Sequence, residues 1–402
     1  MKILMITEDF PYPPSDGVRL RVYHILKGLS KRHEITLLSF IDGNDKVNID
    51  KIKSFCEHIE LIPKNPRKLL LLRVVLNLFE TEPFSLSTFN SKRIRQRIRK
   101  TLIQKKIDIV HLDMPNMAQF YELVAHMPTV IDPRDSITLN LRRRYPLEKN
   151  LFQKAYQYIQ WKKWKRYEAE MYAKFDKCFV VSDVDAEELR LLNSKIDIAI
   201  IPNGVDVDFF KPMRLKPDYP SLIFSGSMAS FQSYDAITYF YKNIYGNVKA
   251  QVPNIKLYIV GKDPPQSVRD LTQDKSVIVT GFVEDIRPFI DRSTVYVCPI
   301  RSGSGIKNRL LEAMAMGKPI VAFTISCKAL NVTHMENIFL ADNCQEFTKG
   351  IITLLSNQRL REKMADNARQ LVEKEYSWEK TVSIIKGAYE EAIRKKQNQV
   401  KK

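Results

Sequence analysis

The chain has few cysteines, few glycines and no long apolar run. Its 402 residues include 5 cysteines and 13 glycines, and the cysteines lie far apart with no CxxC pair. An odd number of scattered cysteines fits neither a disulfide framework nor a zinc site, so we expect buried thiols. No segment approaches the roughly 18 uninterrupted apolar residues that cross a bilayer. The N-terminal MKILMITEDF reads as a strand and lacks a cleavage region, which predicts a cytoplasmic protein.

Positive charge is concentrated in one part of the chain. The formal net charge is +18, and residues 51–106 hold 14 Lys and Arg against 4 Asp and Glu. This region mixes cations with apolar residues, as in RKLLLLRVVLNLFE at 67–80. Such mixtures are typical of a peripheral contact with anionic lipid headgroups, and solvated helix faces are the alternative. Because no nucleic-acid-binding motif accompanies the charge, we expect no nucleic acid partner.

Short apolar β-type runs alternate with segments of helical period along the chain. KILMIT, EITLLSF and IDIVHL come early, and the pattern restarts near residue 221 with SLIFSG, IKLYIVG and TVYVCPI. This alternation predicts an α/β fold of parallel strands joined by crossover helices. Turn and proline signals in IPNGVDVDFFKP separate two doubly wound units, at 1–200 and 201–375. A last helix, at 376–402, has one apolar face and is expected to pack on either unit, the N-terminal one included.

One loop and helix stand out because three of the few glycines fall there. GSGIKNRLLEAMAMGKPIVA runs from Gly303 to Ala322, after an expected strand at 294–300, and its helix begins near Asn308. A helix N-terminus offers unpaired N–H groups and partial positive charge, which suit a phosphate. Lys307 and Arg309 add cations, and Glu312 is placed to accept hydrogen bonds from sugar hydroxyls. An ordinary strand-to-helix turn is the alternative.

This stretch, extended to SGSGIKNRLLEAMAMGKPIVA, resembles the donor-site segment of family 4 glycosyltransferases. IPNGVDVDFF, LIFSGSM, LYIVGKDPP and VIVTGFVEDIRPFI are similar to the family motifs that precede it, and ITEDFPYPPSDGVRLRVYHILKGLSKRHEITLLS resembles its first strand, loop and helix. The resemblance covers most of the chain and is strongest from 201 to 323. It implies the GT-B architecture, two Rossmann-like domains that face each other across a cleft, and the GIKNRLLEAMAMGKP form resembles an exopolysaccharide subgroup.

The resemblance also implies a donor site on the second domain. Glu312 matches the second glutamate of the family's pair, which contacts the nucleotide ribose, whereas Ser304 stands where the first glutamate is usual. The family's Arg and Lys after the first strand of this domain lack clear matches, so Lys307 and Arg309 are the expected replacements. The expected donor-binding residues are Gly226, Ser227, Gly281, Phe282, Ser304, Gly305, Ile306, Lys307, Asn308, Arg309 and Glu312.

On the first domain the resemblance implies an acceptor side. Asp16 and Gly17 stand where many family members have Gly-Gly. The resemblance places this loop on the acceptor side, and a plain strand-to-helix loop is the alternative. Arg134 and Asp135 follow a short apolar strand, and relatives often carry a functional histidine or aspartate nearby. We assign Arg134 to the acceptor side and Asp135 to catalysis; a helix cap is the alternative for Asp135.

Metal and cofactor binding are not expected. Two Asp-x-Asp triplets, at 183–185 and 206–208, are similar to metal-binding carboxylates of the other major glycosyltransferase fold, but they fit a helix cap and a hinge segment better. The six histidines are scattered along the chain. The prediction is therefore a site with no metal and no cofactor, since the nucleotide-sugar is a substrate.

The sequence thus predicts a glycosyltransferase that moves a hexosyl group from a nucleotide-sugar to a saccharide or lipid-linked acceptor, with retention. A non-catalytic partner subunit of the same fold is one alternative, motivated by Ser304, and a nucleotide-sugar epimerase is another. An anionic membrane surface is the expected further partner. With the N-terminus as above, we expect a cytoplasmic protein, peripheral on the inner face of the membrane.

Overall fold

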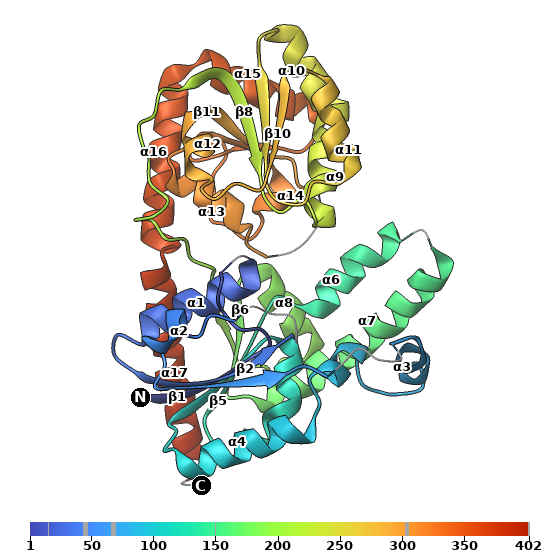
Figure 1. The fold of residues 1–402 in the computed structure, drawn as a ribbon, viewed down its shortest axis with the longest axis vertical. Helices are drawn as coiled ribbons and strands as arrows, with labels where there is room; N and C mark the ends of the chain where they lie inside the picture. The colour runs from blue at the N-terminus through green and yellow to red at the C-terminus, as the bar shows by residue number, and fades with distance from the viewer. Residues whose placement is uncertain (15, 43–46, 66–69, 149, 302–304, 401–402) are drawn as a thin grey trace. The chain divides into compact units, whose positions relative to one another are not determined.

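The computed structural model describes residues 1–14, 16–42, 47–65, 70–148, 150–301 and 305–400. Ser304 lies outside these residues. The chain divides into two compact units, the first made of residues 1–203 and 381–402 and the second of residues 204–380. Each is an α/β unit (Figure 1).

The first unit is built on a parallel sheet in which, over the described residues, the strand order is β3-β2-β1-β4-β5-β6-β7. The strands are β1 (Lys2–Thr7), β2 (Glu34–Ile41), β3 (His58–Pro63), β4 (Ile109–Asp113), β5 (Thr129–Arg134), β6 (Lys177–Val180) and β7 (Ile198–Ile200). The helices are α1 (Gly17–Leu29), α2 (Asp50–Lys53), α3 (Leu70–Asn77), α4 (Lys92–Gln104), α5 (Tyr121–Val124), α6 (Ile137–Arg144), α7 (Leu151–Met171), α8 (Asp183–Leu192) and most of α17 (Trp378–Val400).

The strands of this sheet are apolar on both faces because helices cover both. Along β1, Leu4 and Ile6 enter one core, while Ile3 and Met5 enter the other. The C-terminal helix α17 contributes to the second of these cores through one stripe of its surface, since Ile385, Ala388, Tyr389 and Ala392 are buried there. The last helix of the chain therefore packs on the N-terminal sheet.

The second unit has its own parallel sheet, with the order β10-β9-β8-β11-β12-β13 over the described residues, and a separate hydrophobic core. The strands are β8 (Asp218–Ser225), β9 (Lys256–Val260), β10 (Val277–Gly281), β11 (Ser293–Cys298), β12 (Ile320–Phe323) and β13 (Phe339–Ala341). The helices are α9 (Phe231–Phe240), α10 (Gly246–Gln251), α11 (Gln266–Arg269), α12 (Arg287–Arg292), α13 (Asn308–Ala315), α14 (Thr324–Cys327), α15 (Cys344–Ser356) and α16 (Gln358–Glu375).

Candidate active site

The strand order locates the ligand-binding edge of each unit. In open parallel sheets, ligands bind beyond the carboxyl ends of the strands, where the order reverses. That point lies between β1 and β4 in the first unit and between β8 and β11 in the second. The loops that follow these strands are therefore the candidate ligand-binding loops of each unit.

In the second unit, Arg309 lies directly over the turn that follows β8. A Cβ atom on Gly226 would stand 2.5 Å from Cζ of Arg309, and Gly226 has a φ of +143°. The guanidinium is held in place because Nη2 donates to Oγ of Ser233 at 3.0 Å, and Cζ lies 5.4 Å from the ring centre of Phe224. Nη1 is buried and has no hydrogen-bond partner in the described part of the chain. An oriented cation with an unused donor is suited to a phosphate oxygen.

Neighbouring turns approach this point closely. A Cβ atom on Gly261, which follows β9, would stand 1.7 Å from the carbonyl oxygen of Gly226. The Gly261 amide in turn donates to the carbonyl of Gly281 at 3.1 Å. Gly226, Gly261 and Gly281 thus bring three strand ends together, with Ser227 half-buried beside them and the Phe282 ring 72% exposed. An exposed ring at this edge is available for stacking on a nucleobase.

The helix α13 follows the loop after β11 as the sequence predicts. Lys307 is its N-cap residue and makes no capping hydrogen bond with its side chain. Asn308 begins the helix, Ile306 is buried in the core, and Gly305 is half-buried. The helix begins at the carboxyl edge of the sheet, so its positive end faces the candidate site.

Glu312 lies one turn into α13, on the same side as Arg309 by helical spacing. Burial raises the pKa of the Glu312 carboxyl to about 7, and the charge of Arg309 opposes that shift. Hydrogen bonds donated to the carboxylate would favour its ionised form. Ribose hydroxyls are donors of that kind.

Arg301, by contrast, is already engaged on the surface of this unit. Its Nη2 lies 2.9 Å from both carboxylate oxygens of Asp235, and its Cζ lies 3.8 Å from the ring centre of Tyr239. Arg309 is therefore better placed than Arg301 to meet a diphosphate.

In the first unit, Glu8 directly follows β1 at the reversal point. Nδ2 of Asn116, which follows β4, donates to Oε2 of Glu8 at 3.0 Å, and Oγ of Ser85 donates to Oδ1 of Asn116 at 2.8 Å. Burial raises the pKa of Glu8 to about 7 against the effect of the Asn116 hydrogen bond. This edge therefore presents a carboxyl group that changes protonation near neutral pH.

Arg134 and Asp113 form a buried pair at the ends of β5 and β4. Nη2 of Arg134 donates to Oδ1 of Asp113 at 2.6 Å, whereas Oδ2 of Asp113 and Nε of Arg134 have no partner among the described residues. Burial raises the pKa of Asp113, and the guanidinium opposes it. Met114 and Arg134 have φ values of 79° and 71°. Non-glycine residues rarely adopt this conformation, and it concentrates at functional sites.

A second buried network of charged and polar side chains lies beside this pair in the first unit. Nε of Arg21 donates to Oδ2 of Asp132 at 3.1 Å, and Nη1 donates to Oδ1 of Asn203 at 2.9 Å. His111 lies 3.7 Å from Asp132 through Nε2 and hydrogen-bonds the Tyr389 hydroxyl through Nδ1 at 2.6 Å. Burial lowers the pKa of His111 to about 4, so it is neutral at pH 7. The network ties α1, the sheet and α17 together.

The donor atoms of His111, Asp113 and Asp132 lie within 4.8 Å of one another, which raises the question of a metal. They do not fit one. Arg21 and Arg134 already pair with the two carboxylates, and a divalent cation would be repelled by both guanidinium groups. The cluster is an internal ion-pair network. The absence of a metal from the reaction stays a prediction.

The other residues predicted for the acceptor side have structural contacts. Asp16 caps α1, since Oδ1 accepts from the amides of Val18 and Arg19 at 2.9 and 3.0 Å, and the Gly17 carbonyl accepts from Nη1 of Arg134 at 3.5 Å. Asp135 is half-buried beside Arg134. The alternative interpretation of Asp135 as a helix cap is wrong, because the cap of α6 is Ser136.

The expectation that the aspartate triplet at 183–185 caps a helix also needs correction. The cap of α8 is Ser182, whose hydroxyl accepts from the amide of Asp185 at 3.3 Å. Asp185 uses Oδ1 to accept from the amide of Ser136 at 3.0 Å and Oδ2 to accept from Ser182. Asp185 therefore connects α8 to the start of α6.

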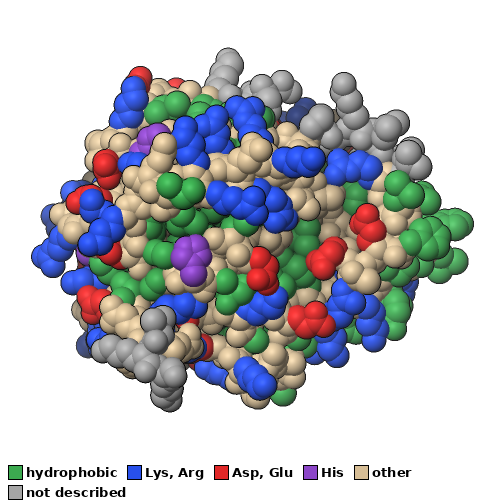
Figure 2. All heavy atoms as spheres, turned by 90° about the horizontal axis from the view of Figure 1, so that it is seen from below, with side chains coloured by type: hydrophobic (Ala, Val, Ile, Leu, Met, Phe, Trp, Pro, Cys, Tyr) green, Lys and Arg blue, Asp and Glu red, His purple; other side chains and the backbone are tan. Residues whose placement is uncertain are grey.

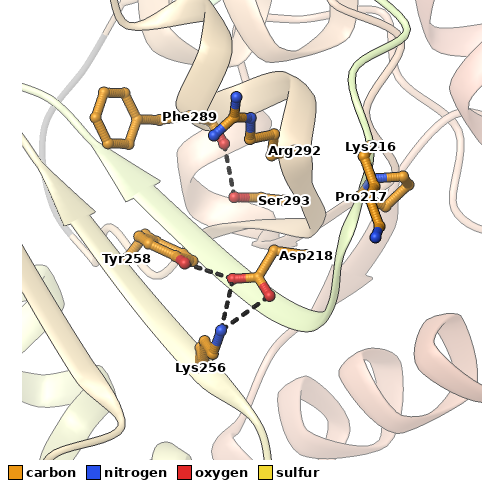
Figure 3. Close-up of a pocket in the computed structure, with 8 residues that line it drawn as sticks. All are labelled: Lys216, Pro217, Asp218, Lys256, Tyr258, Phe289, Arg292 and Ser293. Atoms are coloured by element: carbon orange, nitrogen blue, oxygen red, sulfur yellow. Dashed lines mark hydrogen bonds and ion pairs between the residues drawn. The ribbon is translucent and has the colours of Figure 1, made fainter.

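A hollow of about 510 Å³ lies at the amino edge of the second-unit sheet, away from the reversal point (Figure 3). Its lining residues are Lys216, Pro217, Asp218, Lys256, Tyr258, Phe289, Arg292 and Ser293. Nζ of Lys256 contacts Asp218 at 3.0 Å, and the Tyr258 hydroxyl also donates to it. Because Asp218, Lys256 and Ser293 begin strands, this hollow is separate from the candidate site.

Comparison with known proteins decides the family. The profile described as Glycosyltransferase Family 4 matches residues 15–209, and that of Glycosyl transferases group 1 matches residues 219–357. The chain belongs to the family 4 glycosyltransferases. A Klebsiella pneumoniae protein, an uncharacterized 44.6 kDa protein in the cps region, is 20% identical over 96% of this chain and 98% of its own length. The phosphatidyl-myo-inositol mannosyltransferase of Mycobacterium leprae is 24% identical over 75% of this chain and 78% of its own length.

Solved structures share the fold of this glycosyltransferase. The sucrose-phosphate synthase of Thermosynechococcus elongatus superposes with a TM-score of 0.72, at 14% identity, over 98% of this chain and all of that one. HepE of Anabaena, in complex with UDP, has a TM-score of 0.66 at 16% identity, over 97% of this chain and all of that one. The predicted family and α/β fold class are confirmed. Across the described residues, no helix is both long and apolar enough to cross a membrane.

Sequence reasoning missed the residues of the first-unit edge apart from Arg134. Glu8 follows β1, Asp113 ends β4 and Asn116 lies shortly after β4, and the apolar runs predict both strands. The signal that would have found them is their place at or just beyond the carboxyl ends of the two strands at the reversal point. That point depends on strand order, which the apolar runs do not specify.

Proposed function

We propose that this glycosyltransferase transfers a hexosyl group from a nucleotide-sugar to a saccharide or lipid-linked acceptor, with retention and without a metal. The donor belongs to the second unit and the acceptor to the first. One observation carries the proposal: the Arg309 guanidinium is fixed on Gly226 at the reversal point with Nη1 unpartnered among the described residues.

On this proposal, the second unit binds the diphosphate by charge. Arg309 donates through Nη1 to a phosphate oxygen, and Lys307 with the positive end of α13 adds further positive potential. These groups are oriented before the reaction, so they stabilise charge that develops on the departing diphosphate. Glu312 accepts hydrogen bonds from the ribose. The HepE complex with UDP supports this ligand class.

The first unit supplies polar groups for a hydroxyl-rich acceptor. Glu8 and Asp113 offer carboxyl oxygens, and Arg134 offers a guanidinium, at the ends of three adjacent strands. A carboxyl whose pKa is about 7, as for Glu8, accepts a hydrogen bond from an acceptor hydroxyl when ionised. The mannosyltransferase relative, named for phosphatidyl-myo-inositol, supports a lipid-linked acceptor.

The proposal is tested first by the binding of nucleotide-sugars and then by the release of the nucleotide with and without an acceptor. Thermal shift with UDP-glucose and other nucleotide-sugars should identify the donor, because a ligand that binds only the folded state raises the apparent melting temperature. Release of the nucleotide should then accelerate only when an acceptor is added. Fast acceptor-independent conversion would favour an epimerase, and binding with no turnover across all acceptors would favour a non-catalytic partner.

A further inference from the structure

The hairpin formed by α6 and α7 stands clear of the first-unit sheet (Figure 1). One face of α7 is exposed along its length, and its positions recur at helical spacing: Leu151, Ala155, Tyr158, Lys162 and Lys165. Leu151 is 80% exposed and the adjacent Phe152 is 89% exposed. Side chains of this size are expensive to leave in water unless something covers them.

The exposed face changes character along the helix. Its first part is apolar, through Leu151, Phe152 and Tyr158, and its later part is cationic, through Lys162 and Lys165. The whole segment 137–166 carries nine Lys and Arg against one Glu. Lys162 is about 16 Å along the axis from Leu151, at about 1.5 Å per residue.

Aromatic side chains and cations are interleaved at the hairpin. The rings of Tyr145, Tyr158 and Trp161 lie 5.8 to 6.3 Å apart between centres. Nζ of Lys154 lies 5.2 Å from the Tyr145 ring, and Nζ of Lys162 lies 5.4 Å from the Tyr158 ring. Amphipathic aromatic rings beside lysines are typical of the headgroup region of a bilayer.

A second exposed apolar group adjoins α7. Val75 and Leu76, at the end of α3, and Leu78 and Phe79, just after it, are 40% to 86% exposed. Nε2 of Gln160 donates to Oδ1 of Asn77 at 2.9 Å, which holds this end of α3 against α7. Figure 2 shows hydrophobic side chains gathered at the edge of the molecule where α3 and the hairpin lie in Figure 1.

The hairpin is joined by hydrogen bonds to the segment that follows the first-unit edge. Carboxylate oxygens of Glu168, on α7, accept from the amides of Ile137 and Thr138 at 2.7 and 3.0 Å and from Oγ of Ser136 at 3.1 Å. Ser136 caps α6 and lies two residues after Arg134, and Ile137 and Thr138 begin the helix. A surface bound by the hairpin is therefore connected, through one short helix, to the strand end that carries Arg134.

We propose that the hairpin surface, Leu151, Phe152, Tyr158, Lys162 and Lys165, docks on an anionic lipid bilayer. Leu151 and Phe152 enter the headgroup region, and the lysines further along α7 pair with anionic headgroups. This inference rests on the proposed function in one respect, namely that a lipid-linked acceptor would reach the first unit from that bilayer.

The charge complementarity favours the hairpin over the basic segment 51–106. Several cations of that segment are already in ion pairs: Arg97 with Glu60 at 2.7 Å, Lys105 with Glu57 at 3.5 Å and Lys64 with Asp9 at 2.6 Å. On the hairpin, Arg142 also pairs with Glu188, at 2.7 Å, whereas Lys162 of the proposed surface lies over aromatic rings.

The test is co-sedimentation of the full chain with vesicles of phosphatidylcholine alone and of phosphatidylcholine mixed with phosphatidylglycerol. The wild-type protein should bind the mixed vesicles and lose binding as salt rises, because salt screens exposed charges. The double variant Leu151→Ser, Phe152→Ser should lower the apparent partition coefficient at least tenfold. Lys162→Gln with Lys165→Gln should lower it on mixed vesicles and reduce its salt dependence.

Leu191→Ser is the matched control, since Leu191 is 82% exposed on α8 of the same unit. It should bind as the wild type does. UDP affinity is measured in every variant, because it reports the donor site of the second unit separately. Equal partition of the Leu151, Phe152 double variant and the wild type would overturn the inference, as would equal binding to both vesicle types or to neither, while UDP binding would still stand.

Discussion

Removal of the Arg309 side chain tests the donor site most directly. Arg309→Ala deletes the guanidinium that lies over Gly226, with its bond to Ser233 and its unpartnered Nη1. A hydrogen bond to a charged group contributes about 1.5–3 kcal/mol. With about 1.4 kcal/mol per tenfold change, the dissociation constant for UDP should rise roughly 10- to 150-fold. Arg309→Lys should recover only part of this loss, because lysine cannot reproduce the planar guanidinium.

The assay is calorimetric titration of UDP into each variant, with thermal unfolding as a check on folding. Losing one hydrogen bond of the charged guanidinium and one ring contact should cost about 2–4 kcal/mol of stability, and the unfolding curve shows whether the variant is folded at the temperature of the titration. Arg301→Ala is the control, since its partner is the surface residue Asp235, and its UDP affinity should match the wild type. If folded Arg309→Ala binds UDP within threefold of the wild type, the reasoning about the diphosphate is refuted.

Three further outcomes are expected. Because the pKa of Glu312 is about 7 in the folded state against 4.5 normally, the folded state keeps the proton to higher pH, and the free energy of unfolding falls as pH rises from about 5 to 7. UDP-glucose affinity should rise over the same range, since the ionised carboxylate accepts the ribose hydrogen bonds. Glu312→Gln should remove both changes, as pH-dependent thermal shift and calorimetry would show. Gly226→Ala should weaken UDP binding by displacing Arg309, whereas Gly246→Ala, where a Cβ meets no atom within 4 Å, should not, as titration of both would show. Tyr389→Phe leaves Nδ1 of the buried His111 unsatisfied and should cost about 1–3 kcal/mol in denaturant unfolding with UDP affinity unchanged.

The sequence predicted much of the second unit correctly. The helix α13 begins at Asn308, and the inward residues Leu310, Leu311 and Ala313 are buried. This success has a local cause, since an apolar stripe of helical period has one stable way to pack on a sheet. The role of Arg309 could be suggested as a charge near the helix start, but its contact with Gly226 could not, because the two residues are far apart in the chain.

The first-unit edge was largely beyond prediction. Glu8, Asp113 and Arg134 belong to three strands, and only the order in the sheet, with β1 beside β4 and β4 beside β5, makes them neighbours. His111 meets Tyr389 across 278 positions of the chain. No local pattern encodes such pairs, since they arise when burial of apolar faces selects one topology.

By itself, therefore, the sequence determined the class of fold, the family and the elements that carry the donor motif, because these depend on periodicity and on motifs within short stretches. Tertiary structure alone decided which charged groups are buried, paired or exposed. It paired Arg301 with Asp235 and left Nη1 of Arg309 unpartnered among the described residues. It also left Phe152 in solvent. These outcomes depend on long-range packing, which sets the desolvation of each charge and the exposure of each apolar side chain.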